Sequence, residues 1–317
     1  MDRKDAGPDE AASGGPGERW PALPWDAWQA TCDTLHMWTQ IVGKVKLACA
    51  PFLNELWQVA FHTTARGLST GPVPYRDGVF EVEFDFIDHE LSVCTSDGRR
   101  RVLALGPRSV ADFYGDFMGA LGALGIGCRI NPMPVEVPDS IPFPADHAHA
   151  AYDPEYVHRW WLILTRTDQL LEEYRSSFVG KSSPVLFYWG SFDLTETRFS
   201  GRPAEPPAGA PLFVQLAEDQ ENMACGFWPG NTSASGVTLA EPAFYAYAYP
   251  EPSGFKEAPV RPAAAHYDEG LGEFILLYED ARRSDSPEGA IRDFFESTYE
   301  AAATLAHWDR GRLERRS

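Results

Sequence analysis

The chain has 317 residues and a formal net charge of −19, and 44% of its residues are hydrophobic. A chain of this length and composition can bury a large core, so we expect a globular protein of one or two domains. Its negative field repels phosphate backbones and anionic lipid surfaces, which argues against nucleic-acid and membrane partners. No stretch reaches the roughly 18 apolar residues that a membrane span requires.

The cysteines and the two ends of the chain indicate a cytoplasmic protein. The five cysteines are widely spaced and form no Cys-x-x-Cys pair, which is typical of reduced thiols. Residues 1–19 are rich in Gly, Pro, Asp and Glu and lack an apolar run, so we expect a disordered tail and no signal peptide. Residues 309–317 carry four arginines and are expected to form a basic C-terminal tail that complements the last helix.

The first half of the chain predicts a helix, several strands and a second helix. Apolar residues at helical spacing predict a helix over residues 25–42, and Gly43 is expected to end it by adopting a left-handed conformation. Strands are predicted over residues 57–68 and 78–93, the second because apolar and acidic residues alternate. The remaining predictions are a hairpin turn at 96–99, a strand over 101–105, a helix with Ser109 as N-cap, and an edge strand over 130–137.

The same order of elements returns after a Pro-rich connector over residues 138–154. A helix predicted over residues 155–178 is followed by Val-Gly-Lys, as the first helix is, and in each half eight residues separate a Trp from an Arg. We therefore predict an α+β fold of two pseudo-two-fold repeats, residues 20–137 and 155–308, the second with long loop insertions. Each repeat would contain a helix, antiparallel strands and a helix, and both would pack around a shared core with a crevice at their junction.

Several strings of residues resemble the bacterial family called domain of unknown function 5996. They are residues 34–44 (TLHMWTQIVGK), 190–194 (GSFDL), 197–202 (TRFSGR), 226–230 (GFWPG) and 243–250 (AFYAYAYP). The likeness extends from about Trp20 to Trp308, and it implies no activity that can be transferred. Relatives tend to have histidine in place of Leu186 and of Gln220, so any family activity that needs these histidines would be lost or changed here.

Four cations occupy corresponding positions in the two halves: Lys44, Arg66, Lys181 and Arg198. If they face one crevice, they would bind the carboxylate or phosphate of a small metabolite, with the arginines able to bind bidentately. The alternative is structural, because a lysine can neutralise carbonyls at a helix end and an arginine can pair with strand carboxylates such as Asp85.

Other side chains are candidates for proton transfer, metal binding or ligand contact. His36, His62 and Asp193 could act as catalytic acids or bases, since burial would raise the pKa of Asp193 into a working range. His36, His62 and His89 could hold zinc or iron, although their spacing is not a metal motif and each could instead pair with a neighbouring polar group. Trp189 and Tyr247 could line an aromatic-walled ligand pocket or belong to the core.

The leading functional hypothesis is an enzyme, or a descendant of one, that acts on a small anionic or amino-acid-like metabolite in the crevice between the repeats. One alternative is a non-catalytic ligand-binding or protein-interaction module. A second alternative is a metal-dependent oxygenase or hydrolase with histidine ligands. The sequence contains no phosphate-binding loop, dinucleotide fingerprint or zinc signature, and it leaves the cofactor, substrate and oligomeric state open.

Overall fold

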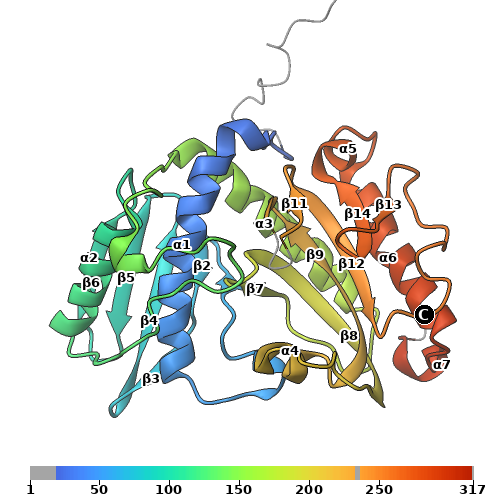
Figure 1. Ribbon diagram of the computed structural model, residues 1–317, viewed down its shortest axis with the longest axis horizontal. Coiled ribbons are helices and arrows are strands. Elements are labelled where there is room, and N and C mark those ends of the chain that lie inside the picture. Colours follow the sequence, from blue (N-terminus) through green and yellow to red (C-terminus); the bar gives the residue numbers. More distant parts are fainter. Residues whose placement is uncertain (1–18, 233–235, 316–317) are drawn as a thin grey trace, which may run out of the picture.

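The computed structural model describes residues 19–232 and 236–315 (Figure 1). The first half contains α1 (Trp25–Cys49), η1 (Asn54–Leu56), β1 (His62–Thr63), β2 (Gly67–Ser69), β3 (Val73–Tyr75), β4 (Gly78–Asp85), β5 (Glu90–Thr95), β6 (Arg100–Ala104), α2 (Val110–Ala123) and η2 (Phe143–Ala145). The second half contains α3 (Pro154–Arg175), β7 (Leu186–Tyr188), β8 (Asp193–Pro203), α4 (Leu212–Ala217), β9 (Gln220–Trp228), β10 (Asn231–Thr232), β11 (Thr238–Leu239), β12 (Ala243–Tyr249), β13 (His266–Asp268), β14 (Glu273–Leu277), α5 (Tyr278–Arg282), α6 (Pro287–Leu305) and α7 (Arg310–Leu313).

Each half builds one large antiparallel sheet, and the second half adds the two-stranded antiparallel pair β10-β11, so the α+β class is confirmed. The first sheet has the order β1-β2-β4-β5-β6, with β3 also paired to β4, and the second has the order β13-β14-β12-β9-β8-β7. The edge strands β1 and β7 lie next to each other, and Phe61 and Phe187 exchange backbone hydrogen bonds of 2.8 and 2.9 Å there. In the part of the chain that the structure describes, no helix is long and apolar enough to cross a membrane.

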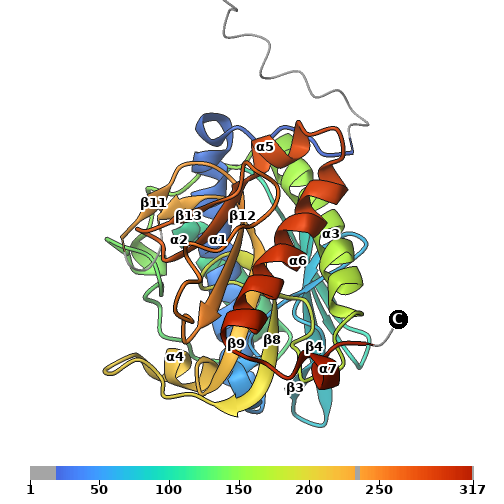
Figure 2. The ribbon, with the colours of Figure 1, turned by 90° about the vertical axis from the view of Figure 1, so that its right-hand side faces the viewer.

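One continuous hydrophobic core joins the two halves. Helix α1 is central to it: Trp28 stacks on Trp160 of α3 at 5.7 Å, and Trp38 stacks on Phe113 of α2 at 4.7 Å between ring centroids. Helices α3 and α6 contact each other and cover one face of the second sheet (Figure 2). The opposite face of this sheet is therefore left to build a cavity.

Gly43 does not end the first helix, because α1 continues to Cys49. A Cβ atom at residue 43 would overlap the indole ring of Trp189, which packs directly on the helix. The glycine thus permits a close approach between the two halves. Burial of the helix against this ring outweighs the preference of glycine for helix ends.

Several predicted strand boundaries are also wrong. Residues 57–68 contain a turn and the short strands β1 and β2, while residues 78–93 divide into β4 and β5 around a turn in which His89 has a φ of 52°. Residues 130–137 form no strand. The hairpin turn at 96–99 and the N-cap are confirmed, since the Ser109 side chain accepts a hydrogen bond from the Asp112 N–H at 3.1 Å.

Residues 309–315 of the predicted C-terminal tail pack onto the rest of the molecule. Residues 310–313 form α7, and the Leu313 carbonyl accepts a hydrogen bond from the Val179 N–H at 2.7 Å. Arg310 pairs with Glu314 of the same segment. The tail expected over residues 1–19 falls, apart from Arg19, outside the described residues, as do residues 316–317.

Candidate functional site

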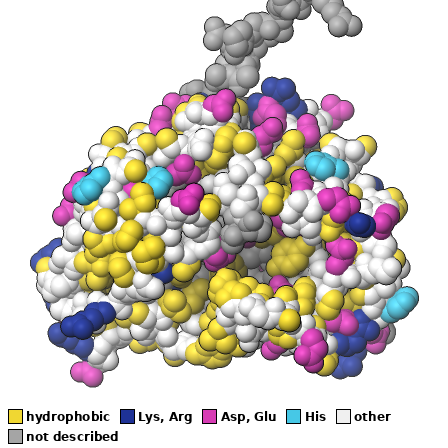
Figure 3. Space-filling view, in the orientation of Figure 1, with side chains coloured by type: hydrophobic (Ala, Val, Ile, Leu, Met, Phe, Trp, Pro, Cys, Tyr) yellow, Lys and Arg dark blue, Asp and Glu magenta, His cyan; other side chains and the backbone are white. Residues whose placement is uncertain are grey.

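A cavity of about 520 Å³ lies between the two halves of the chain. The first half contributes the later part of α1, η1 and residues 135–136, and the second contributes β7, β8, β9, β12, the start of β14, and α4. Helix α4 contacts η1 at one side of the cavity. Hydrophobic side chains gather on the surface over α4, near the lower centre of Figure 3, where Leu212 and Phe213 are exposed.

The floor of the cavity is one face of the second sheet. Asp193, Thr195 and Thr197 alternate along β8 and line the cavity, whereas Leu194 and Glu196 between them are buried on the other face. Thr195 pairs with Gly226 on β9, and Gly226 pairs with Tyr245 on β12. Small residues in the middle strand therefore leave space above the sheet, and tyrosine rings border that space.

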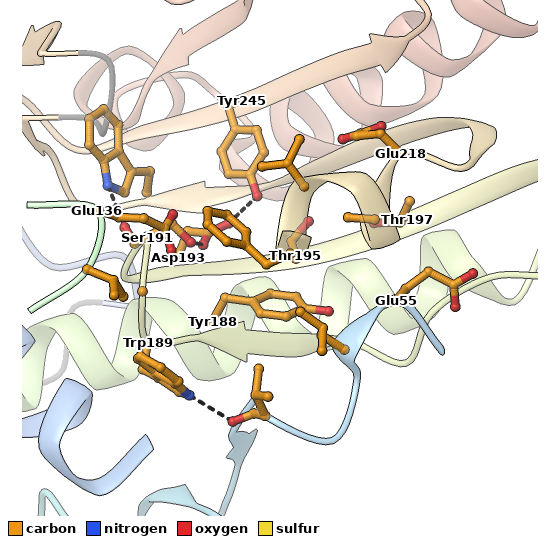
Figure 4. A pocket seen from close by; sticks show the side chains of 18 of the residues that line it. Glu55, Glu136, Tyr188, Trp189, Ser191, Asp193, Thr195, Thr197, Glu218 and Tyr245 are labelled. Atoms are coloured by element: carbon orange, nitrogen blue, oxygen red, sulfur yellow. Dashed lines mark hydrogen bonds between the residues drawn. The ribbon is translucent and has the colours of Figure 1, made fainter. Parts of the chain in front are cut away.

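Asp193 is held by hydrogen bonds from two hydroxyl groups, those of Ser191 and Tyr245 (Figure 4). The Tyr245 ring reaches Asp193 by crossing Gly226, where an added Cβ atom would lie 2.8 Å from the tyrosine oxygen. Burial raises the pKa of Asp193, and the two hydrogen bonds oppose this shift. The carboxyl group can therefore gain or release a proton above the usual pH range of an aspartate.

Glu136 reaches the cavity from a loop of the first half. The side-chain amide of Gln40 on α1 donates to the Val135 carbonyl at 2.8 Å and accepts from the Val135 N–H at 2.9 Å. The next residue, Glu136, has a φ of 58° and directs its carboxylate against Gly190. Burial and the nearby charge of Asp193 raise the pKa of Glu136 to about 7. Its carboxylate makes no hydrogen bond or ion pair with any described residue.

Three further carboxylates line the cavity. Burial, together with Asp193 and Asp268, raises the pKa of Glu273 to about 8, and within the described ranges this carboxylate also has no hydrogen-bonding or ionic partner. Glu218 accepts a hydrogen bond from the Asn222 amide at 2.6 Å, and burial raises its pKa. Glu55 is paired with Lys181.

Five of the ten residues predicted for the site line this cavity: His36, Lys44, Trp189, Asp193 and Tyr247. Trp189 is anchored by a hydrogen bond of 2.8 Å from its indole nitrogen to the Val59 carbonyl. Burial lowers the pKa of Lys44, and its ammonium forms no ion pair with the carboxylates of the cavity. Among the described lysines and arginines, it alone lines the cavity.

The four predicted cations do not face one crevice. Arg66 pairs with Asp85 and Asp88 at the surface, as the structural alternative predicted. Arg198 points away from the cavity, is only 1% exposed, and has its guanidinium carbon 3.3 Å from the ring centroid of Tyr174. The expectation of an anion site built from all four cations is therefore not supported by their positions.

The three histidines are also separated. His36 donates through Nε2 to the Gly190 carbonyl at 2.9 Å, and burial lowers its pKa to about 4, so its ring is neutral at pH 7. His62 is exposed on β1, and His89 bonds through Nδ1 to the Tyr152 hydroxyl at 2.9 Å. Residues 19–232 and 236–315 contain no group of three or more His, Cys, Asp or Glu side chains suited to a metal ion.

The acidic residues are what the sequence reasoning missed. The missed glutamates come from three different kinds of element: Glu136 lies in a loop, Glu218 at the end of the short helix α4, and Glu273 at the start of β14. None of them belongs to a motif, and their common feature is that none forms an ion pair with a described residue. Alternating Tyr245 and Tyr247 were a usable signal for this face of the sheet.

Comparisons with known proteins identify a family but no activity. The model of a family of unknown function, DUF5996, matches residues 20–315. No curated protein and no solved structure matches the chain. The match covers nearly the whole chain and agrees with the resemblance noted from the sequence strings, so this chain belongs to the DUF5996 family of unknown function.

Proposed function

We propose that the cavity between the two halves binds a small organic cation, with a primary amine as the simplest case. The observation that carries the proposal is the composition of the lining, in which the described residues contribute five carboxylates and the single cation Lys44. A carboxylate-rich cavity in a protein of net charge −19 concentrates cations and repels anions. This lining favours a cation over the anionic metabolite expected from the sequence, while the ammonium group of an amino-acid-like ligand remains compatible.

The unpaired state of Glu136 and Glu273 supports the proposal. Both side chains are half-buried. A carboxylate that is partly withdrawn from water and has no partner is costly when ionised, and its pKa rises for that reason. An ammonium ion beside it supplies the missing opposite charge and restores ionisation. The cavity therefore gains more from a bound cation than from a neutral or anionic ligand.

The aromatic lining supports the same ligand class. Tyr188, Trp189 and Trp228 line the cavity together with Tyr245 and Tyr247. Aromatic faces attract ammonium groups and cover the hydrocarbon part of an amine. At the edge of the cavity, the ammonium of Lys181 already lies 4.6 Å from the ring centroid of Phe199.

Catalysis would require proton transfer, for which Asp193 and Glu136 are the best placed groups. Burial raises the pKa of both groups, and the charge of Asp193 raises the pKa of Glu136 further. A carboxyl group with a raised pKa can exchange protons near neutral pH. We keep the enzyme hypothesis as secondary to binding. The free cysteines of the described chain support a cytoplasmic location.

We also infer that the two halves are pseudo-two-fold repeats, residues 20–137 and 155–308, joined by the connector 138–154. The support is the shared order of a helix, an antiparallel sheet and a helix in both halves. A junction between two such units would be a natural position for a ligand.

Calorimetric titration with butylamine and with butyrate tests the binding proposal. We expect butylamine to bind and butyrate not to bind, and Glu136→Gln to weaken butylamine binding roughly tenfold. Glu257→Gln is a matched control, because Glu257 is exposed and does not line the cavity. Binding of butyrate without binding of butylamine would overturn the proposal.

A further inference from the structure

The acidic side chains are spread along the cavity instead of forming one cluster. On β8, Asp193 and Phe199 are six residues apart, and Asn222 of β9 pairs with Phe199 and bonds to Glu218. At ~3.3 Å per residue, these two positions are roughly 20 Å apart along the strand. Figure 4 shows Glu136 beside Asp193 on one side of the view, and Glu218 on the other.

Glu273 lies between these two ends. Phe274 of β14 pairs with Ala246, which places Glu273 next to Tyr247 on the neighbouring strand. Tyr247 pairs with Ala224, and Ala224 pairs with Thr197, which lies between Asp193 and Phe199 on β8. Burial raises the pKa of Tyr247, and the charges of Glu218, Glu273 and Asp193 raise it further, in agreement with this intermediate position.

Apolar and aromatic surfaces separate the acidic positions. The ring of Tyr188 lies between the Asp193 side and the Glu55 side of the cavity in Figure 4. Phe199 and Val214 add apolar lining towards Glu218. A ligand that follows this path meets negative charge, then hydrocarbon-compatible surface, and then negative charge again.

The ion pair of Lys181 with Glu55 is an example, within the protein, of an alkyl ammonium group bound by a carboxylate beside aromatic rings. The Lys181 ammonium binds the Glu55 carboxylate, and it lies 5.7 Å from the ring centroid of Trp57 and 4.6 Å from that of Phe199. Glu55, Trp57 and Phe199 all line the cavity. An alkyl ammonium is therefore already accommodated by a carboxylate and two aromatic rings at this edge.

We infer that the ligand is a linear polyamine that lies along the cavity, with successive ammonium groups at Glu136 and Asp193, at Glu273, and at Glu218. This inference rests on the proposed function, because it specifies which organic cation the cavity takes. A monoamine neutralises one acidic position and leaves the others without an opposite charge. A chain of ammonium groups separated by methylene segments neutralises all three positions and places its hydrocarbon on the aromatic rings.

The test compares spermine, a linear tetraamine long enough to reach along the cavity, with butylamine by calorimetric titration in about 0.15 M salt, where non-specific attraction to an acidic surface is reduced. We expect one spermine per chain, bound at least roughly a hundredfold more tightly than butylamine. Glu218→Gln should weaken spermine binding about tenfold, a larger factor than its effect on butylamine binding. Glu257→Gln should change neither.

Three outcomes contradict the inference, and they are distinguishable. Equal affinity for spermine and butylamine would show that a single acidic position binds the ligand, so the polyamine inference fails while the proposed function stands. Equal weakening of both ligands by Glu218→Gln, with an unchanged melting temperature, would lead to the same conclusion. If neither amine binds, the proposed function fails together with the inference.

Discussion

The hydroxyl of Tyr245 donates a hydrogen bond to the carboxylate of Asp193 from two strands away. Strand β9 lies between them, and the tyrosine ring crosses it at Gly226. This contact couples the outer part of the second sheet to the acidic end of the cavity. It also makes a glycine in the middle of a buried strand a requirement of the site.

Gly226→Ala should destabilise the protein strongly. The new methyl group would collide with the Leu194 carbonyl and with the Tyr245 ring, and we expect the free energy of unfolding to fall by ~2–3 kcal/mol. Urea denaturation measures this change. Gly119→Ala is the matched control, because Gly119 is exposed on α2 with open space around it, and the substitution should stabilise the helix by ~0.5–1 kcal/mol. Equal effects of the two substitutions would contradict the role of Gly226.

Arg198→Ala should lower stability and not act through the ligand. The guanidinium lies between the rings of Tyr174 and Tyr299, at 3.3 and 4.4 Å from their centroids, and its Nε is 3.8 Å from the buried carboxylate of Glu196. Removing it leaves Glu196 without its opposite charge, so the free energy of unfolding should fall by ~3–5 kcal/mol. The exposed Arg66→Ala should have little effect. Unchanged stability of Arg198→Ala would contradict this structural role.

The stability of the Glu273→Gln variant should rise relative to that of the wild type as the pH rises. Folded Glu273 has a pKa of about 8, against an ordinary value of 4.5, so between these values the folded state binds more protons than the unfolded state. The free energy of unfolding of the wild type therefore decreases with rising pH in this window, and the glutamine variant lacks this contribution. Melting temperatures of both proteins at pH 5 and about pH 8 measure the difference. A difference that stays constant with pH would refute the assignment, and Glu257→Gln controls for the substitution itself.

Gln40→Leu should weaken amine binding by releasing Glu136. The substitution removes both hydrogen bonds to the Val135 backbone, and the loss of partners for these groups should cost ~1–3 kcal/mol of stability. Gln40 acts only through the position of Glu136. The double variant that combines Gln40→Leu with Glu136→Gln should therefore weaken butylamine binding little more than Glu136→Gln alone. Gln29→Leu, at an exposed position of the same helix, is the control. Additive losses in the double variant would contradict the positioning role.

Local pattern in the sequence determined much of the fold and the family. The hairpin turn at 96–99 and the Ser109 N-cap each depend on residues that are close in the chain, and the structure contains both. The strings that resemble DUF5996 identified the family, which matches residues 20–315. Gly43 was misjudged because the Trp189 ring that requires it lies far away in sequence.

Only the tertiary structure decided which side chains share the cavity. Periodicity states which face of a strand a residue occupies, and it says nothing about what packs against that face. Lys181 and Arg198 look equivalent to Lys44 and Arg66 in sequence, yet packing places Arg198 under aromatic rings and leaves Lys44 in the cavity. Glu136 and Glu273 meet Asp193 because a loop held by Gln40 and a distant strand converge there, and this convergence depends on long-range packing that no local spacing encodes.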